Sequence, residues 1–323
     1  MRRRHLLGAV ALAATVPQSG RAQVFPERPI RFIVPYAPGG STDTSARIVS
    51  EKLAAVFGQP VIVENKPGGG TIIGTEIVAK SKPDGHTILL TPAAMIAIAA
   101  FGMATPYDID KDLVPVVGFV DLPILLAASN QAPFKTVAEL ISWSKAEPGR
   151  TVTYASAGVG SLTHLWGEYV KAKTGLPMEH VGYKGSAEAL RDVIAGHVPL
   201  FADVLVPTAT AVRAGQIRGL AVAMAQRSEL LPDVPTVAEA GLPGTEGTVP
   251  FGISVPGGTP ASVVIKINTA FNEALADPTI RRKLLELGFI PVGGAPQAYV
   301  AVLANEIAKW RKVIKESKIP PPS

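Results

Sequence analysis

The sequence of 323 residues contains no cysteine. Disulfide bonds, thiolate metal sites, cysteine nucleophiles and a lipid-anchored N-terminal cysteine are therefore excluded. Charged residues are also scarce, at 18% of the chain, whereas 47% of the residues are hydrophobic. This composition is typical of a well-packed globular protein and not of a disordered one. The length allows two domains or one large α/β domain.

Hydrophobic runs long enough to cross a bilayer are absent as well. The run from Leu122 to Ala128 is far too short, and the one from Leu6 to Val16 has only 11 residues. Three arginines at positions 2–4 precede this second run, and small residues before and at Ala22 suit a signal peptidase. These features predict an export signal over residues 1–22, cleaved near Ala22, and a soluble exported protein. The arginine pair leaves both the general and the twin-arginine export routes open.

A basic surface of the kind that binds nucleic acid is also absent. The formal net charge is +5, but four of the arginines lie in the predicted signal, which leaves about +1 for the mature chain. No run of lysine or arginine of the kind that binds nucleic acid remains after the signal. We therefore expect no nucleic-acid partner.

The common catalytic and cofactor motifs are missing too. The sequence has no G-x-S-x-G nucleophile elbow, no phosphate-binding G-x-x-x-x-G-K-[ST] loop and no dinucleotide fingerprint. Its four mature histidines, at positions 86, 164, 180 and 197, form no pair at a spacing of three or four residues that would hold a metal on a helix. We expect a protein that is not an enzyme and that uses no cofactor and no metal.

The stretch from Ile30 to Gly58 predicts a strand, a glycine loop and a helix in succession. Residues 30–34 are apolar except for Arg31 and mostly β-branched. Gly39 and Gly40 predict a loop after them, and Ser41 suits the N-cap of a helix that Gly58 ends. Such a unit directs free backbone N–H groups and the positive end of a helix at one point, which suits an anion. The alternative is a plain strand–helix connection whose glycines serve only the turn.

The same unit returns later in the chain. A strand over residues 152–156, a loop over residues 157–160 and an N-cap at Ser161 repeat the order after 120 residues. Two apolar runs, Leu113–Val120 and Pro123–Ala128, lie between the units and meet at a hinge-like Asp121. Strands and helices alternate elsewhere, which predicts parallel-rich α/β sheets with one unit in each of two lobes. The C-terminal helices can return to cover the first lobe, and the apolar stripe of the last helix, from Val300 to Ile314, predicts core packing.

Four polar side chains near these units are candidates for ligand contact. His164 lies in the first turn after the second loop, where capping and packing are the alternatives to binding. Asp43 either complements a helix dipole or meets a bound amine. Asp203 ends an apolar strand, at the edge of the sheet where ligands bind in open α/β folds. Lys184 could pair with an anion, although a solvated turn lysine is the default.

The chain resembles the Bug-type receptors, which are the extracytoplasmic solute receptors of tripartite tricarboxylate transporters. The resemblance runs from about Phe25 to the C-terminal helix. Seven segments carry it: PERPIRFIVPYAPGGSTDTSARI, VIVENKPGGG, KPDGHTILL, YASAGVGSLTHL, GYKGSAEALRDVIAG, IRGLAVA and LPDVPTVAEAGLPG.

The resemblance implies a periplasmic binding protein fold of type II, with two lobes joined by two crossings and the ligand in the cleft between them. Domain I would comprise residues 23–121 and 253–323, and domain II residues 122–252. The implied function is a monomeric periplasmic receptor that captures a small carboxylated solute and delivers it to membrane transporter subunits. By position, the implied ligand-binding residues are Tyr36, Gly39, Gly40, Ser41, Thr42, Asp43, Pro92, Ala93, Ala94, Ala157, Gly158, Gly160, Ser161, His164, Tyr183 and Asp203.

Two alternatives to a transport receptor stay open at this point. A ligand-sensing partner of a signalling kinase would have the same sequence signature, and an exported hydrolase would need a nucleophile and base that the sequence does not offer. The sequence also leaves open which carboxylate binds.

Overall fold

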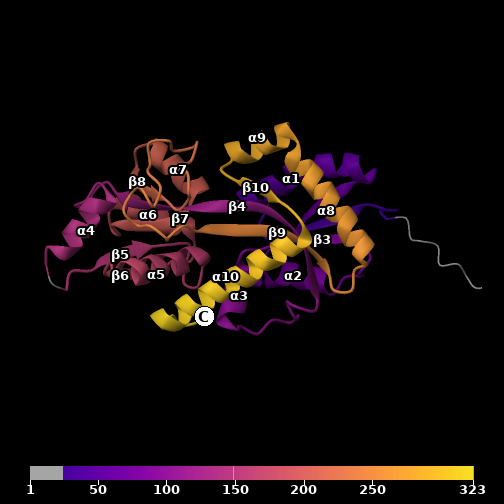
Figure 1. Ribbon diagram of the computed structural model, residues 1–323, viewed down its shortest axis with the longest axis horizontal. Coiled ribbons are helices and arrows are strands. Elements are labelled where there is room, and N and C mark those ends of the chain that lie inside the picture. The colour runs from indigo at the N-terminus through magenta and orange to yellow at the C-terminus, as the bar shows by residue number, and fades with distance from the viewer. Residues whose placement is uncertain (1–24, 148, 323) are drawn as a thin grey trace, which may run out of the picture.

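The computed structural model describes residues 25–147 and 149–322. The predicted export signal and its cleavage site lie outside these residues. Within them, two groups of strands and helices form two lobes, side by side along the longest axis of the molecule (Figure 1). The two-lobed α/β architecture predicted from the sequence is confirmed. No helix in this part of the chain combines the length and apolar character needed to cross a membrane.

The described strands form one mixed sheet with the order β2-β1-β3-β9-β4-β7-β5-β6, and β8 and β10 also pair with β4. The pairs of β1 with β2 and β3 and of β5 with β6 and β7 are parallel, whereas the strands that pair with β4 are antiparallel to it. The strands are β1 (Ile30–Val34), β2 (Val61–Asn65), β3 (Thr87–Thr91), β4 (Leu113–Ser129), β5 (Val152–Ala155), β6 (Met178–Val181), β7 (Leu200–Val204), β8 (Ile217–Val222), β9 (Thr248–Pro256) and β10 (Ile290–Gly293).

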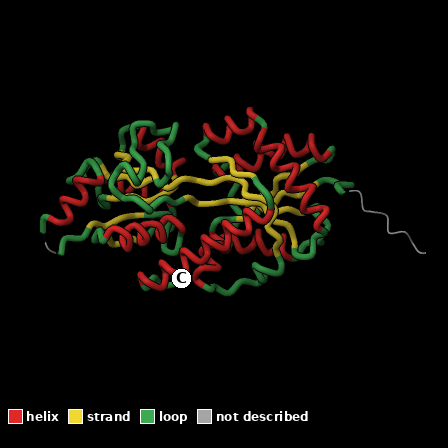
Figure 2. The backbone as a smooth tube through the Cα atoms, in the orientation of Figure 1, coloured by secondary structure: helices red, strands yellow, loops and turns green. Residues whose placement is uncertain are grey.

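Helices cover both faces of this sheet (Figure 2). They are α1 (Ser41–Phe57), α2 (Ile72–Ala79), α3 (Ala94–Phe101), α4 (Val137–Lys145), α5 (Leu162–Thr174), α6 (Ser186–Ala195), α7 (Leu205–Arg213), α8 (Ala261–Ala276), α9 (Pro278–Glu286) and α10 (Pro296–Ser317), with a short 3-10 turn over Gly69–Thr71.

The strand β4 belongs to both lobes. Its first part, up to Pro123, pairs with β9 and β10, and from Ile124 onward it pairs with β7 and β8. The two apolar runs expected on either side of Asp121 therefore form one continuous strand that changes partners. Figure 1 shows β4 and β9 running side by side from one lobe into the other. These two strands are the crossings between the lobes.

The last helices divide between the lobes. As expected, α8 and α9 cover the first lobe: α8 packs on α1 and β4, and the ring of Phe271 meets those of Phe32 and Phe119 edge to face. Helix α10 continues past the first lobe and packs on both α3 and α5. Its Trp310 is fully buried, whereas Val300 of the predicted core stripe is 47% exposed. This helix is therefore a third connection between the lobes.

Candidate functional site

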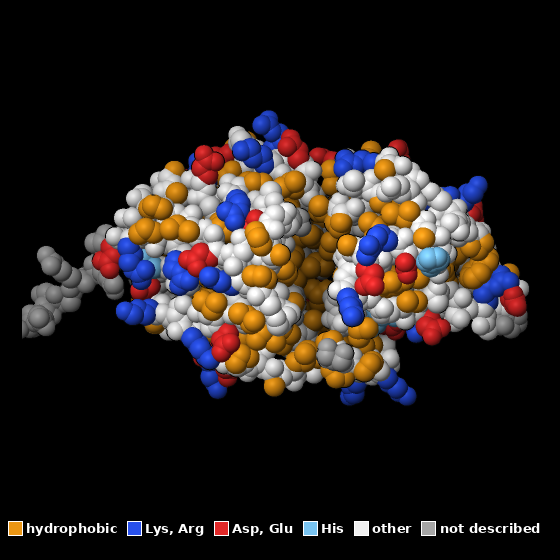
Figure 3. Space-filling model, turned by 180° about the vertical axis from the view of Figure 1, so that it is seen from behind, with side chains coloured by type: hydrophobic (Ala, Val, Ile, Leu, Met, Phe, Trp, Pro, Cys, Tyr) orange, Lys and Arg blue, Asp and Glu red, His pale blue; other side chains and the backbone are white. Residues whose placement is uncertain are grey.

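A cavity of about 670 Å³ lies between the two lobes. The first lobe contributes Tyr36 and Thr42, the second contributes Gly158 and Ser161, and Phe251 lies at the crossing strand β9. Seen from behind, the molecule is hollowed between its two halves, and hydrophobic side chains line the hollow (Figure 3). This volume is typical of a site for one small molecule.

The structure brings together most of the residues that the sequence singled out. Those that line the cavity are Tyr36, Thr42, Ala93, Ala94, Ala157, Gly158, Gly160, Ser161 and Asp203. Those that do not are Gly39, Gly40, Asp43, Pro92, His164 and Tyr183. The side chain of Ser41 lies outside the described part of the structure. The lining residues come from both strand–glycine–helix units, so both units face one space.

Six helices begin at this cavity. Their starts contribute the lining residues Thr42 of α1, Ile72 of α2, Ala94 of α3, Leu162 of α5, Ser186 of α6 and Val204 before α7. The first N–H groups of a helix have no acceptor within it, and they give its N-terminus a partial positive charge. No side-chain hydrogen bond caps α1, α3, α6 or α7. The cavity is thus surrounded by helix ends that suit an anion.

Basic side chains are missing from the wall. Among the described residues that line the cavity there is no lysine, arginine or histidine. Lys184, which was a candidate, is exposed and is not part of the lining. An anion in this cavity would therefore be held by backbone N–H groups and hydroxyls, and not by an ion pair.

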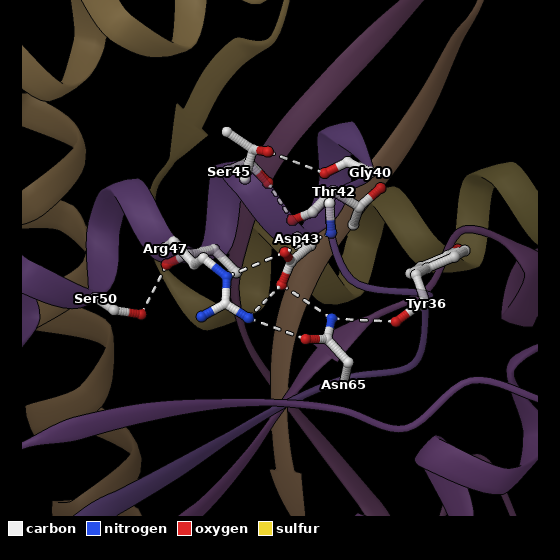
Figure 4. Close-up of polar contacts among 11 residues, drawn as sticks. Tyr36, Gly40, Thr42, Asp43, Ser45, Arg47, Ser50 and Asn65 are labelled. Carbon is white, nitrogen blue, oxygen red and sulfur yellow. Dashed lines mark hydrogen bonds and ion pairs between the residues drawn. The ribbon is translucent and has the colours of Figure 1, made fainter.

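The first glycine loop is held in place by Asp43, which is only 3% exposed. Its carboxylate accepts hydrogen bonds from the Gly39 N–H at 2.9 Å, from Asn65 Nδ2 at 2.9 Å and from Arg47 Nε at 3.0 Å (Figure 4). Asn65 also donates to the Tyr36 carbonyl at 3.1 Å. Because its donors come from the loop, the helix and the neighbouring strand, Asp43 fixes the loop from behind the cavity wall. Burial acts to raise the pKa of the carboxyl, but these contacts together outweigh it, so the pKa is lowered.

The second loop is held by the first turn of its own helix. Ser161 caps α5 by accepting from the His164 N–H at 3.2 Å, and its hydroxyl donates to the Gly158 carbonyl at 2.7 Å. The His164 ring accepts a hydrogen bond from the Gly160 N–H through Nδ1 at 3.0 Å, and Thr163 Oγ1 accepts from the Ala157 N–H at 3.2 Å. His164 thus takes the capping and packing role. The N–H groups of Ala157, Gly158 and Gly160 are thus already bonded, so the donors that this unit can offer a ligand include those at the start of α5.

A buried polar cluster supports this loop from inside the second lobe. The Tyr154 hydroxyl donates to Glu168 Oε1 at 3.0 Å, and the Ser156 hydroxyl lies 2.8 Å from His180 Nε2. Burial lowers the pKa of His164 and of His180 to about 4. Both rings are therefore neutral at physiological pH.

Asp203 is the one charged side chain in the described wall of the cavity. It lies in β7 and is 1% exposed, and its Oδ1 accepts from the Val204 N–H at 2.7 Å. Burial raises its pKa to about 6, against the opposing effects of the Ser186 side chain and the Val204 N–H. The carboxyl thus lies near the end of its strand and lines the cavity, and its contact with a ligand stays a prediction.

The apolar wall was not foreseen from the sequence. It is made by one face of α3 with Ala97, Ile98 and Phe101, and by Leu122 and Val249 on the crossing strands. Helix α3 is apolar throughout, so no polar face indicates which side meets the cavity. The C-terminal Pro322 and the helix start at Ser186 also line the cavity. Ser186 could have been found, because it begins a helix directly after Gly185, in the short loop that follows the strand β6.

No group of three or more histidine, aspartate or glutamate side chains in the described residues could hold a metal ion.

Comparison with known proteins agrees with this architecture. The family profile described as "Tripartite tricarboxylate transporter family receptor" matches residues 45–319. The UPF0065 protein in the tcbD-tcbE intergenic region of Pseudomonas sp. (strain P51) is 39% identical over 98% of this chain and 95% of its own length. Protein BugT of Bordetella pertussis is 34% identical over 97% of this chain and 96% of its own length.

Solved structures with the same fold include two with a named ligand. R. palustris Rpa4515 with adipate is 36% identical, with a TM-score of 0.79, over 92% of this chain and 100% of that one. MatC from Rhodopseudomonas palustris with bound malate is 32% identical, with a TM-score of 0.74, over 90% of this chain and 100% of that one. The fold is that of a type II periplasmic binding protein, as the sequence predicted.

Proposed function

Because the chain belongs to the receptor family of tripartite tricarboxylate transporters, we propose that it is a periplasmic binding protein that captures a small carboxylated solute between its lobes and delivers it to the membrane subunits of such a transporter. The observation that carries this proposal is the cavity at which six helices begin and whose described lining contains no basic side chain. Helix N-termini bind carboxylates through N–H groups without an arginine clamp. The adipate and malate of the two solved relatives are also carboxylates.

The ligand contacts that we propose come from the lining. The carboxylate accepts from the N–H groups at the starts of α1 and α5, with the hydroxyls of Thr42 and Ser161 beside them. Ala93 and Ala94 lie at the start of α3 and help to hold ordered water there. Asp43 and His164 act as positioning residues, because their side chains bond the loops and do not line the cavity.

We further propose that the lobes close over the ligand, with domain I formed by residues 23–121 and 253–323 and domain II by residues 122–252. The change of partners along β4, between Pro123 and Ile124, supports a hinge close to this boundary. Two crossing strands whose ends lie in different lobes can bend there without breaking the pairing inside either lobe.

Export and assembly are part of the same proposal. The protein is exported through the signal over residues 1–22 and is cleaved near Ala22, it acts as a monomer, and it does not turn its ligand over. N-terminal sequencing of protein from the periplasm that began at Met1 would contradict the cleavage near Ala22.

A thermal-shift screen with mono-, di- and tricarboxylates tests the proposed function, and calorimetry then measures the affinity of those that stabilise the protein. A ligand at 100 times its Kd adds about 2.7 kcal/mol to the free energy of unfolding. The matched control for each acid is its primary amide, which has the same shape without the charge. The protein should be stabilised by at least one acid and not by its amide, and the acid should be recovered unchanged.

Stabilisation by no carboxylate, or equal stabilisation by acid and amide, would contradict the proposal. Product in excess of the protein concentration would show an enzyme instead.

A further inference from the structure

The Asp203 carboxyl leaves one oxygen without a hydrogen bond at the cavity. Its Oδ1 accepts from the Val204 N–H, and the Ser186 side chain also acts to lower the pKa of the carboxyl. Oδ2 is buried, however, and receives no hydrogen bond of normal geometry from the described residues. Four other described buried side-chain atoms share this condition, on Thr71, Tyr107, Glu306 and Trp310, and none of these residues lines the cavity. A buried acceptor without a donor is costly, so this oxygen marks a place for a donor supplied by the ligand.

The balance of charge in the cavity limits the ligand to one carboxylate near this place. The described lining supplies partial positive charge from helix N-termini and one carboxyl, with no cationic side chain to compensate a second anion. Two carboxylates close together in a buried site repel each other, and one of them must then take up a proton. A second carboxylate on the ligand would be repelled by the Asp203 carboxylate in this way.

The remaining wall is apolar. Ala97, Ile98 and Phe101 of α3 face the space from the first lobe, and Leu122, Val249 and Phe251 line it at the crossing strands. Apolar surface of the ligand would be removed from water against this wall, whereas a polar group there would lose its water without finding a partner. The wall therefore favours an apolar body between the carboxylate and the donor.

We propose that the cavity selects a monocarboxylate whose apolar body carries one hydrogen-bond donor, a hydroxyl or amino group, and that Asp203 receives this donor. The inference rests on the proposed function, because it assumes that the cavity binds a carboxylate. It goes further in naming the class of ligand and in making Asp203 the residue that determines specificity. Adipate and malate, which the two solved relatives hold, are dicarboxylates and fall outside this class.

Two matched series of probes test it by calorimetry on the mature wild-type protein. The first series compares hexanoate with adipate, which share a chain length and differ in the second carboxylate. The second compares 2-, 3- and 4-hydroxybenzoate with benzoate and with the corresponding methoxybenzoates, which keep the oxygen but lose the donor. Hexanoate should bind at least tenfold tighter than adipate. One hydroxybenzoate should bind at least tenfold tighter than both benzoate and its own methoxy derivative.

The variant Asp203→Asn removes the charge and keeps the shape. Both preferences should fall to threefold or less in this variant, because the repulsion of adipate and the acceptor for the hydroxyl are weakened together. Asp233→Asn is the matched control, since Asp233 is an exposed carboxylate of the same lobe outside the cavity. It should retain the wild-type preferences.

The outcomes distinguish a failure of the role given to Asp203 from a failure of the proposed carboxylate receptor function. Adipate binding as tightly as hexanoate, methoxybenzoates binding as tightly as hydroxybenzoates, or unchanged preferences in Asp203→Asn would overturn the assignment of Asp203 and leave the carboxylate receptor standing. Binding of none of the acids, including the dicarboxylates and tricarboxylates, would overturn the proposed function and this inference with it. The wild-type ranking tests the proposed class of ligand without any variant, and Asp203→Asn tests whether Asp203 is the residue that sets it.

Discussion

The imidazole rings of His164 and His180 stack with their centroids 3.8 Å apart, directly behind the second glycine loop. Burial lowers the pKa of both rings to about 4, whereas histidine in an unfolded chain titrates near pH 6.5. The unfolded chain therefore binds more protons than the folded protein between these values. The stability that the neutral pair contributes is lost as the pH falls from about 6.5 to about 4.

This pH dependence is measured as a difference between proteins. Burial raises the pKa of Asp121 and of Asp203 to about 6, and these two carboxyls act in the opposite direction over the same window. In His180→Gln, the loss of unfolding free energy between pH 6.5 and 4 should be smaller than in the wild type by on the order of 1 kcal/mol. Denaturant titrations of both proteins at several pH values give this difference. The contributions of Asp121 and Asp203 cancel in it, because both proteins contain these carboxyls.

The exposed His197 provides the control for that series, because its side chain is 70% exposed. His197→Gln should lose stability with falling pH as the wild type does. Equal slopes for all three proteins would mean that the stacked pair does not titrate as its burial indicates.

A substitution at Gly158 should disturb the second loop. Its φ is +135°, and a Cβ atom there would lie 2.8 Å from the carbonyl oxygen of Tyr183. Gly158→Ala should therefore lower the free energy of unfolding by about 1–3 kcal/mol and weaken ligand binding, since strain and a backbone clash occur together. Gly40→Ala in the first loop is the control: Gly40 has φ −73°, and the nearest atom to its added Cβ would be 3.7 Å away. If thermal unfolding shows the same loss of unfolding free energy in both variants, the loop conformation does not depend on glycine at position 158.

Asp43 should affect binding without touching the ligand. In Asp43→Ala the Gly39 N–H and Asn65 lose their shared acceptor, so the first loop should become less ordered and the affinity for a bound carboxylate should fall about tenfold or more. Glu51→Ala, on the exposed side of the same helix, should bind as the wild type does. Calorimetry with one confirmed acid, together with amide hydrogen exchange of residues 36–40, separates this role from direct contact. Normal exchange with lost affinity would indicate direct contact instead.

Closure of the lobes can be followed with spin labels, because the chain has no native cysteine. Ile73 in the first lobe and Val159 in the second are both exposed and lie next to or in the cavity wall. The distance between labels on Ile73→Cys and Val159→Cys should shorten by several ångströms when a carboxylate saturates the protein. The pair Ile62→Cys and Ile73→Cys, within the first lobe, should show no change. A constant distance across the cavity in a protein that binds would contradict hinge closure.

Helix α10 adds a constraint on that motion. Its Trp310 meets the Tyr169 ring of α5 edge to face at 6.2 Å, while its Arg311 donates to the Ala99 carbonyl of α3 at 3.2 Å. These contacts reach both lobes. If the lobes close, α10 must therefore move with one lobe and shift its contacts with the other.

Local patterns in the sequence were sufficient for much of the fold. The helix expected from Ser41 to Gly58 forms over Ser41–Phe57, and Gly58 ends it in the left-handed conformation. Ser161 caps α5 with its side chain, as its position after a glycine loop predicted. Such features depend on residues within one turn of each other, which is why the sequence reveals them.

Features that depend on distant contacts were harder to predict. The change of partners in β4 depends on β7, β8, β9 and β10, and nothing within residues 113–129 marks it except Asp121 and Pro123. The place of Pro322 at the cavity depends on the whole path of α10.

The most direct test of the receptor function is a titration followed by two-dimensional amide NMR, with hexanoate or the tightest acid from the screen. The amide signals of Thr42, Leu162 and Ser186, at the starts of three helices in two lobes, should shift together and saturate with one Kd. Signals of Arg282 and Lys312, on exposed faces away from the cavity, should remain in place. Shifts confined to one lobe, shifts without saturation, or no shifts at the helix starts would contradict a carboxylate held between the lobes.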